Sequence, residues 1–384
     1  MTNTACANSS PNNPETRTMI SPAIQSPPPE NTPGSAPATV EQLIHRAEAA
    51  SASDIHLQMI GDGAVVSFRL DGLMTPATTF PADLADRVFG RIKFLAKLKT
   101  YQESLPQDGR IDKHTVNARS DIRVATYPTV TGEKIVLRLF SPGSARGLAE
   151  LEFPIVATAE LQGFLRQTAG LLLLTGPAGS GKTTTIYACL RALAEPAGRH
   201  IITIEDPVEQ IVPGVMQTEV NEARGLDFAC AARHLLRQDP QVLVIGEIRD
   251  EETANLAVRA ALTGHLVIAT LHAGSSRGVL ERLLMTCADR SAIASAVGMI
   301  LNHRLLRRVC RACAGAGCAT CLQTGYAGRV PLVEWLRVDA ALSAQIRGHD
   351  LSALTPARTL EQSARQLVQT GITNQLEYDR IFGL

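Results

Sequence analysis

The sequence is poor in aromatic residues, in net charge and in long apolar runs, and these scarcities exclude several classes of protein. Aromatic residues make up 4% of the 384 residues and the formal net charge is +0, so neither stacking side chains nor a basic excess points to nucleic acid. No apolar run approaches the roughly 20 residues that cross a bilayer. The first residues have neither the basic nor the apolar region of a signal peptide. We therefore expect a soluble protein of two or three domains.

Cysteine occurs eight times, but its spacing argues against a disulfide framework. Four cysteines are scattered, which suits a reducing compartment; they are Cys6, Cys189, Cys230 and Cys287. The other four follow the pattern Cys310-x2-Cys313-x4-Cys318-x2-Cys321. Two Cys-x2-Cys knuckles can supply four thiolates in a tetrahedron, which suits structural Zn²⁺. Redox activity is the competing interpretation of the same residues.

The strongest single motif is a phosphate-binding loop between a predicted strand and a predicted helix. An apolar run from Leu171 to Leu174 leads into Gly176-x4-Gly181-Lys182-Thr183. Glycines let the backbone amides point at a phosphate, and the helix N-terminus adds partial positive charge. Lys182 can reach the β- and γ-phosphates, and the Thr183 hydroxyl can bind Mg²⁺. We expect the whole loop to bind ATP, namely Gly176, Pro177, Ala178, Gly179, Ser180, Gly181, Lys182, Thr183 and Thr184.

Composition and periodicity divide the chain into five parts. Residues 1–38 are rich in Pro, Asn, Ser and Thr and predict a disordered tail. Residues 39–143 mix helical and strand patterns, which predicts an α+β module, and a Pro/Gly/Ser stretch at 141–147 reads as a hinge. The remaining parts are a RecA-like ATPase domain at 144–305, a tetracysteine zinc subdomain at 306–335 and C-terminal helices at 336–384.

The RecA-like part alternates helical patterns with short apolar runs. Such runs are too hydrophobic to face water, so they predict a parallel sheet with helices on both faces. The expected strands are 171–175, 200–205, 242–247 and 266–271. After residue 272 we expect the chain to become helical, pass through the cysteines and end in short helices.

Two predicted strands end in carboxylates. Glu247 follows an apolar run and a glycine, so it is a candidate for the Mg²⁺-associated acid. Glu205, Asp206 and Glu209 close another strand, and three carboxylates at one strand end are costly unless they face a metal or arginines. Glu205 is therefore the candidate general base for the attacking water. The alternative is a solvated loop with one helix cap.

Histidines and arginines complete the candidate site. His272 follows a strand at a position suited to sensing the γ-phosphate, and His265 lies before the same strand. Phosphoryl transfer develops charge that cations can neutralise. Arg249 lies just past Glu247, whereas Arg110, Arg123 and Arg138 lie in the first module and reach the loop only if domains or subunits close on one another.

Several boxes in order resemble one family, the secretion ATPases of bacterial type II secretion and type IV pilus assembly. Ala52 to Leu57, Leu105 to Arg110 and Arg123 to Glu133 resemble its amino-terminal module. The loop at Gly176 resembles its Walker A motif. Further boxes resemble its aspartate box, Walker B signature, histidine box and zinc subdomain, at 202–209, 236–250, 263–273 and 310–329.

The resemblance implies a cytoplasmic homo-hexamer that uses ATP, Mg²⁺ and Zn²⁺. It implies a motor that acts on inner-membrane platform proteins and lies at that membrane only through them, without a span of its own and without nucleic acid. It supports Glu205 as catalytic carboxylate and Glu247 as the Mg²⁺-associated one. It also supports Arg110 and Arg123 as charge-neutralising residues. No additional platform-docking domain is expected before residue 40.

The sequence departs from the family pattern and leaves other functions open. Gln241 and Ala273 replace an Asp and a Thr, and the loop between the cysteine knuckles is short. A pilus-retraction ATPase resembles this layout but generally lacks the four cysteines. A non-hydrolysing ATP-binding scaffold is a third possibility. A nucleic-acid translocase is a fourth, and it rests on the arginines beside the cysteines, namely Arg304, Arg307, Arg308 and Arg311.

Overall fold

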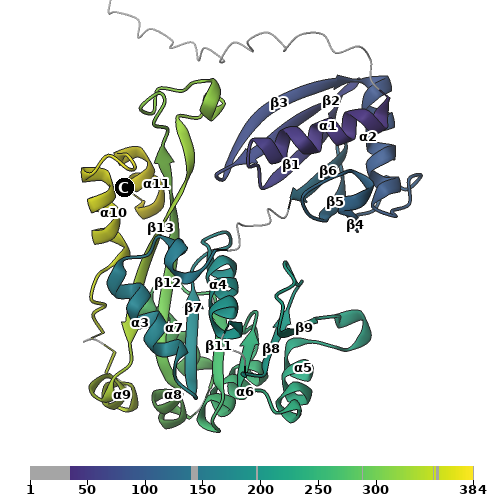
Figure 1. Ribbon diagram of the computed structural model, residues 1–384. Helices are drawn as coiled ribbons and strands as arrows, with labels where there is room; N and C mark the ends of the chain where they lie inside the picture. The colour runs from purple at the N-terminus through teal and green to yellow at the C-terminus, as the bar shows by residue number, and fades with distance from the viewer. Residues whose placement is uncertain are drawn as a thin grey trace, which may run out of the picture.

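The computed structural model describes residues 35–139, 146–195, 198–287, 289–348, 350–351 and 354–383. Most of the predicted 1–38 tail and most of the 141–147 hinge lie outside these residues. Within them the chain forms two sheets, each covered by helices, which confirms the expected α/β architecture (Figure 1). The described residues contain no helix long and apolar enough to cross a membrane.

The first module is an antiparallel six-stranded sheet in the order β3-β2-β1-β6-β5-β4. Helices α1 (Ala36–Ala49) and α2 (Ala82–Leu95) pack against it and share its core. Helix α1 begins at Ala36, inside the predicted 1–38 tail, and Pro37 is tolerated because it lies in the first helical turn. The strands are β1 (Asp54–Ile60), β2 (Gly63–Leu70), β3 (Leu73–Pro81), β4 (Gln107–Ile111), β5 (Ile122–Thr129) and β6 (Gly132–Leu139).

The two edge strands of this module, β3 and β4, are absent from the sequence prediction. Strand β3 contains two prolines, and proline is found in sheets mainly at edges because it cannot donate to the ladder. Strand β4 reads Gln-Asp-Gly-Arg-Ile and has little apolar alternation. Edge strands bury less surface than central ones, so their sequences carry a weaker pattern.

The second unit is a seven-stranded sheet in the order β13-β12-β7-β11-β10-β8-β9. Four parallel strands coincide with the predicted runs, namely β7 (Gly170–Thr175), β8 (Ile201–Glu205), β10 (Val242–Ile245) and β11 (Leu266–Leu271). Strand β9 (Val215–Glu219) adds a further parallel strand beside β8. Alternate leucines of β7 enter two cores, since Leu171 and Leu173 face one and Leu172 and Leu174 the other.

Helices cover both faces of this sheet, as the buried parallel strands require. Helices α3 (Ile155–Leu165) and α4 (Lys182–Ala194) supply the core on one face. The opposite core is supplied by α5 (Phe228–Leu235), α6 (Glu251–Leu262), α7 (Ser276–Thr286), α8 (Arg290–Ala296) and α9 (Ala340–Arg347). Helices α10 (Leu360–Gln369) and α11 (Gln375–Phe382) form a smaller core with the far ends of β12 and β13.

The expectation that the chain becomes helical after residue 272 is wrong for two long segments. Strand β12 (Val297–Val309) pairs parallel with β7 and antiparallel with β13 (Tyr326–Arg337). Its leucines and arginines are good helix formers, but pairing on both sides overrides that weak preference. Both strands run across the predicted boundaries at 305 and 335, and the cysteine-containing loop connects them at the top of Figure 1.

Candidate functional site

The predicted site residues meet at the carboxyl edge of the parallel strands. Strand β7 ends at the predicted phosphate-binding loop, Gly176 to Thr184 (the phosphate-type loop). Glu205 is the last residue of β8. Glu247 follows β10 and His272 follows β11. Because parallel strands end at the same edge of a sheet, residues far apart in sequence become neighbours there. His265 precedes β11 and lies at the opposite edge, where it bonds to the carbonyl of Ala260 at 2.9 Å.

The loop from Gly176 to Thr184 joins β7 to α4. Gly176 has φ 132°, and a Cβ there would lie 2.4 Å from the carbonyl oxygen of His303, so only glycine fits. The Lys182 ammonium donates to the carbonyl oxygens of Gly176 and Pro177 at 2.8 and 3.0 Å. Burial lowers its pKa. The lysine is thus held at the mouth of the loop, where the N-terminus of α4 adds partial positive charge.

Glu205 is buried, and hydrogen-bond donors surround its carboxylate. Tyr187 donates its hydroxyl proton to one oxygen at 2.5 Å. Thr203 and Gln217 donate to the other at 2.5 and 2.9 Å. The Tyr187 oxygen in turn accepts from the backbone N–H groups of Glu209 and Gln210. The carboxylate is therefore held in one orientation, and burial and Glu205 both raise the pKa of Tyr187, which keeps the phenol protonated.

Glu247 lies between Arg249 and His272. Arg249 Nε donates to one of its oxygens at 2.8 Å, and His272 Nε2 lies 3.0 Å from the other. Arg249 also contacts Asp206 at 3.2 Å and stacks over the ring of Phe228. The Glu247 charge acts on Lys182 as well, since it raises the pKa of that lysine against the larger effect of burial.

A cavity at this edge brings the two carboxylates and the phosphate-type loop together. Lys182 and Thr183 line it from the start of α4, Glu205 and Glu247 from two strand ends, and Arg249 from the loop after β10. Oxygen ligands of this kind are those Mg²⁺ prefers. The cavity therefore has cations for phosphate oxygens and carboxylates for a metal or a water.

The first-module arginines are placed differently from one another. Arg110 pairs with Asp121 of its own module at 2.7 Å. Arg123 and Arg138 are neighbours in the ladder of β5 and β6. Partial desolvation and the Glu205 charge raise the pKa of Glu209, and Arg138 and Arg123 oppose that shift. Arg138 is nevertheless paired with Asp54 of its own module at 2.9 Å, as Arg110 is with Asp121.

The three residues that hold Glu205, namely Tyr187, Thr203 and Gln217, are absent from the sequence prediction. Tyr187 lies one helical turn after the Lys182–Thr183 pair, and Gln217 lies on strand β9, which was itself not predicted. Tyrosine occurs only five times in the chain. A rare polar aromatic on the helix that follows a phosphate loop is a signal that sequence reading could have used. Gln217 has no comparable signal, because its role depends on how β9 pairs with β8.

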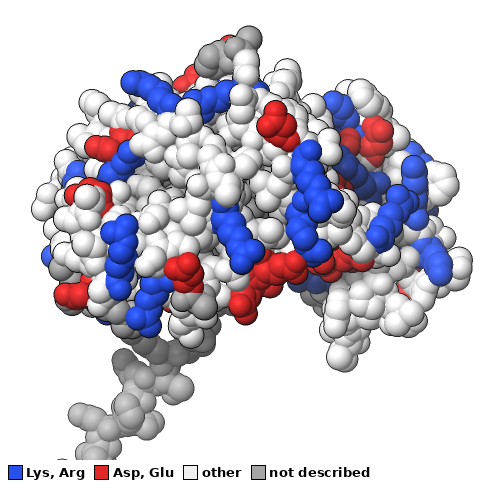
Figure 2. Space-filling model, turned by 90° about the horizontal axis from the view of Figure 1, so that it is seen from below, with Lys and Arg blue, Asp and Glu red and all other residues white. Residues whose placement is uncertain are grey.

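Two of the four arginines in the run beside the cysteines are engaged within the chain. Arg307 contacts the buried carboxylate of Glu377 at 3.2 Å, and Arg308 pairs with Glu152. On the face in Figure 2, basic side chains stand singly or in small groups among uncharged and acidic residues. This face of the described chain therefore lacks the continuous basic stripe typical of a nucleic-acid channel.

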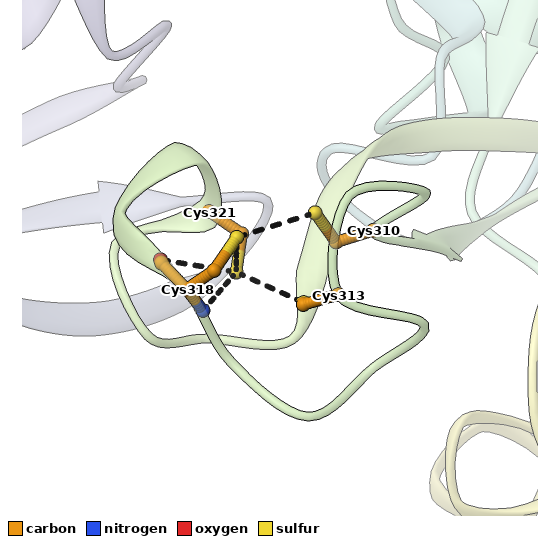
Figure 3. Close-up of side chains that lie close together, drawn as sticks. All are labelled: Cys310, Cys313, Cys318 and Cys321. Atoms are coloured by element: carbon orange, nitrogen blue, oxygen red, sulfur yellow. Dashed lines mark hydrogen bonds between the residues drawn. The ribbon is translucent and has the colours of Figure 1, made fainter.

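The four predicted zinc ligands converge on one point in the loop between β12 and β13 (Figure 3). All four sulfurs lie within 4.8 Å of one another. Cys310 and Cys318 are 3.9 Å apart, Cys313 and Cys321 3.8 Å, and Cys318 and Cys321 3.7 Å. A tetrahedron of sulfurs at a Zn–S distance of about 2.3 Å has edges of about 3.8 Å. The cluster is consistent with zinc.

Backbone amides stabilise the thiolate form of two of these sulfurs, and metal binding needs that form. The amides of Cys318 and Gly325 donate to the sulfur of Cys321 at 3.2 and 3.3 Å. Burial raises the pKa of the Cys321 thiol, but these donors outweigh it and bring the value to about 6. Backbone donation likewise lowers the pKa of Cys318. Amide–thiolate bonds of this kind orient the ligands of a metal site.

The covered parallel sheet, with a glycine loop and carboxylates at its carboxyl edge, defines the class of P-loop nucleoside triphosphatase folds. A family model described as "Type II/IV secretion system protein" matches residues 31–380. The chain therefore belongs to the Type II/IV secretion system ATPase family, as the resemblance predicted.

Individual relatives agree with this assignment. The chain is 40% identical to the type II secretion system protein HxcR of Pseudomonas aeruginosa over 78% of this chain and 66% of that relative. It is 36% identical to the putative type II secretion system protein E of Escherichia coli over 88% of this chain and 74% of that relative. It is 37% identical to the type IV pilus assembly ATPase PilB of Thermus thermophilus over 85% of this chain and 39% of PilB. It thus spans about two thirds of HxcR and less of PilB.

Solved structures share the fold. The pilus retraction motor PilT with bound ADP matches with a TM-score of 0.65 at 27% identity, covering 89% of this chain and 96% of PilT. The Legionella pneumophila ATPase DotB matches with a TM-score of 0.72 at 20% identity, covering 92% of this chain and 98% of DotB. Both support the expected RecA-like core with a smaller domain before it.

Proposed function

We propose that this chain is an ATP-hydrolysing motor that powers type II secretion or type IV pilus assembly. The observation that carries the proposal is the cavity where Lys182, Thr183, Glu205 and Glu247 meet at the edge of a secretion-ATPase fold. Relatives named as type II secretion proteins and as pilus assembly ATPases support the choice of process.

In this proposal the phosphate tail of ATP lies along the loop from Gly176 to Thr184. Backbone amides and Lys182 hold its oxygens. Thr183 and Glu247 would hold Mg²⁺, which supplies positive charge to the β- and γ-phosphates. Glu205, held rigid by Tyr187, orients the attacking water and accepts its proton.

Arginines and histidine neutralise the charge that develops as the phosphate leaves. His272 lies against Glu247, where it can respond to the γ-phosphate. Arg123, and Arg110 once it leaves Asp121, approach from the first module of the same or a neighbouring subunit. ATP binding would draw the modules together and hydrolysis would release them. The working form proposed is a cytoplasmic hexamer docked on inner-membrane platform proteins.

We also propose that Cys310, Cys313, Cys318 and Cys321 bind one structural Zn²⁺. Their sulfur separations and the amide donors to Cys321 support this role over redox exchange. Four thiolates around one ion satisfy its coordination, so the site would be closed and structural.

The direct test is ATP turnover by the purified chain together with complementation of a strain that lacks its gene. We expect hydrolysis that requires Mg²⁺, and restoration of protein secretion or of pilus assembly. Whether secretion or pilus assembly is restored decides which of these two processes the motor powers. A chain that binds ATP without turnover, or that restores output without turnover, contradicts the proposal and favours a scaffold.

A pilus-retraction motor is the second candidate, and the likeness to PilT supports it. Retraction predicts a different phenotype, because loss of the gene would leave filaments that extend and do not shorten. Loss of filaments or of secretion in the deletion strain contradicts retraction.

Replacing Tyr187 with Phe tests how Glu205 is held. The change removes one donor to Glu205 and the acceptor for two backbone N–H groups. We expect the free energy of unfolding to fall by about 1–3 kcal/mol, because two partly buried N–H groups lose their partner. We expect kcat to fall more than KM changes, since ATP itself does not contact Tyr187 in this proposal. Thermal unfolding and steady-state kinetics measure both.

The matched control is Tyr101→Phe, because Tyr101 is 83% exposed. It should leave both quantities unchanged. Equal kinetics for the two variants would show that the Tyr187 hydroxyl does not position the carboxylate.

A further inference from the structure

Strands β12 and β13 form a ribbon whose lower part contacts the candidate ATP site. The carbonyl oxygen of His303 lies against Gly176 of the phosphate-type loop. Asn302 Nδ2 donates to the carbonyl of Gly274, just after the histidine box, at 3.3 Å. On the partner strand, Glu334 accepts from the Ser276 hydroxyl at 2.7 Å. The ribbon is therefore packed against two loops at the carboxyl edge of the sheet.

The far part of the same ribbon contacts the turn between β2 and β3 of the first module. Asp71 lies between β2 and β3, and one of its carboxylate oxygens contacts Arg329 Nε at 3.1 Å. The other accepts from the backbone N–H of Gly328 at 2.8 Å. The backbone carbonyl of Asp71 accepts from Arg307 Nε at 2.9 Å. One residue thus makes three polar contacts across the interface.

The ribbon side of this interface is rigidly built. The Arg307 guanidinium is 9% exposed and contacts the Glu377 carboxylate, which is 1% exposed. Glu377 also accepts from the backbone N–H of Arg307 at 2.9 Å and from Arg380. The Tyr326 ring packs against the Arg307 guanidinium. The buried Glu377 carboxylate of helix α11 therefore fixes Arg307, which donates to the backbone carbonyl of the turn.

The turn that contacts the ribbon has a tight backbone conformation. Asp71 has φ 47° and Gly72 φ 84°, a pair of left-handed residues that forms a tight hairpin turn. A cavity beside the contact is lined by Arg46 and Phe68 of the first module, by Leu322 of the cysteine-containing loop and by Ala327 of β13.

We propose that this is an intrachain docking site and that Asp71 is a positioning residue for ATP hydrolysis. Through Arg329, Gly328 and Arg307 it holds the first module, which carries Arg110 and Arg123, against the ribbon. The ribbon then links this contact to the phosphate-type loop. The activity readout of this inference rests on the proposed ATPase function.

The test is a double-mutant cycle of Asp71→Gly and Arg329→Gln in the full chain. Glycine accepts the positive φ of residue 71, so the turn keeps its shape and only the carboxylate contacts are lost. We expect each variant to lower kcat by about fivefold, and the double variant to be no worse than the single ones, because both remove the same contact. Hydrogen exchange of the segment around Gly328 should speed up in Asp71→Gly. The matched control is Asp62→Gly in the exposed β1–β2 turn.

Each outcome decides the inference. Unchanged exchange around Gly328 in Asp71→Gly shows that the docking contact does not form. Unchanged kcat, or an equal loss in the Asp62→Gly control, shows that Asp71 does not position the module for catalysis. Additive losses in the cycle show that Asp71 and Arg329 do not act through one another. A wild-type chain without turnover overturns the proposed function and the positioning role, while the exchange measurement still decides whether the turn docks.

Discussion

Replacing Glu205 with Gln is expected to lower ATP turnover by about 10²–10⁴-fold, the range typical of losing a general base. The amide cannot accept a proton from water, and one oxygen that accepts hydrogen bonds from Thr203 and Gln217 or from Tyr187 becomes an NH₂ group. Secretion or filament assembly should be lost with turnover. ATP binding should persist, because Lys182 and the loop amides are untouched. Turnover, nucleotide affinity and complementation are measured on the same variant.

The control for this change is Glu195→Gln, at the exposed C-terminal end of α4. It alters the same residue type on an element of the same domain and should leave turnover unchanged. A Glu205→Gln variant with wild-type turnover would show that Glu205 is a structural acceptor for Tyr187 and that Glu247 alone serves the reaction. Loss of turnover with full secretion would instead favour the scaffold function.

The parallel core was predictable because its strands are buried on both faces. Leu171 to Leu174 and Val242 to Ile245 are continuous apolar runs, and such runs have few structures available to them. Strand β12 was not predictable in the same way. Its sequence contains leucines and arginines that suit a helix, and only its pairing with β7 and β13 makes it a strand. Long-range pairing of this kind leaves little local signal.

The site was predictable at strand ends and unpredictable where it depends on tertiary contacts. The carboxyl edge of the sheet places Glu205, Glu247 and His272 together, as the strand pattern implies. Tyr187 and Gln217 reach Glu205 only because α4 and β9 pack beside β8. The docking of Asp71 on Arg329 joins residues 258 positions apart through two different sheets (329 − 71 = 258). Such a contact has no sequence period that could reveal it.

Metal analysis is expected to find one zinc per chain, and removal of that zinc should have a large effect. A structural zinc site contributes roughly 10–16 kcal/mol of apparent binding free energy. The loop between Cys310 and Cys321 has two short knuckles and few buried apolar residues, so without the ion it has little to hold its shape. We expect Cys318→Ser to lose zinc and to make the loop susceptible to proteolysis. Zinc content and limited proteolysis measure these effects.

The control is Cys230→Ser, since Cys230 is partly exposed on α5 and lies outside the cluster. It should keep the full zinc content. The parallel core should survive zinc loss, because the cores on both faces of the sheet contain no residue of the cysteine loop. The cavity beside Asp71 is lined by Thr320, Cys321 and Leu322, so a collapsed loop should also loosen the docked turn. Zinc removal should therefore speed hydrogen exchange around Gly328 while β7 and β11 stay protected. A cysteine cluster that is metal-free after gentle purification, with the loop still protected, would overturn the zinc assignment.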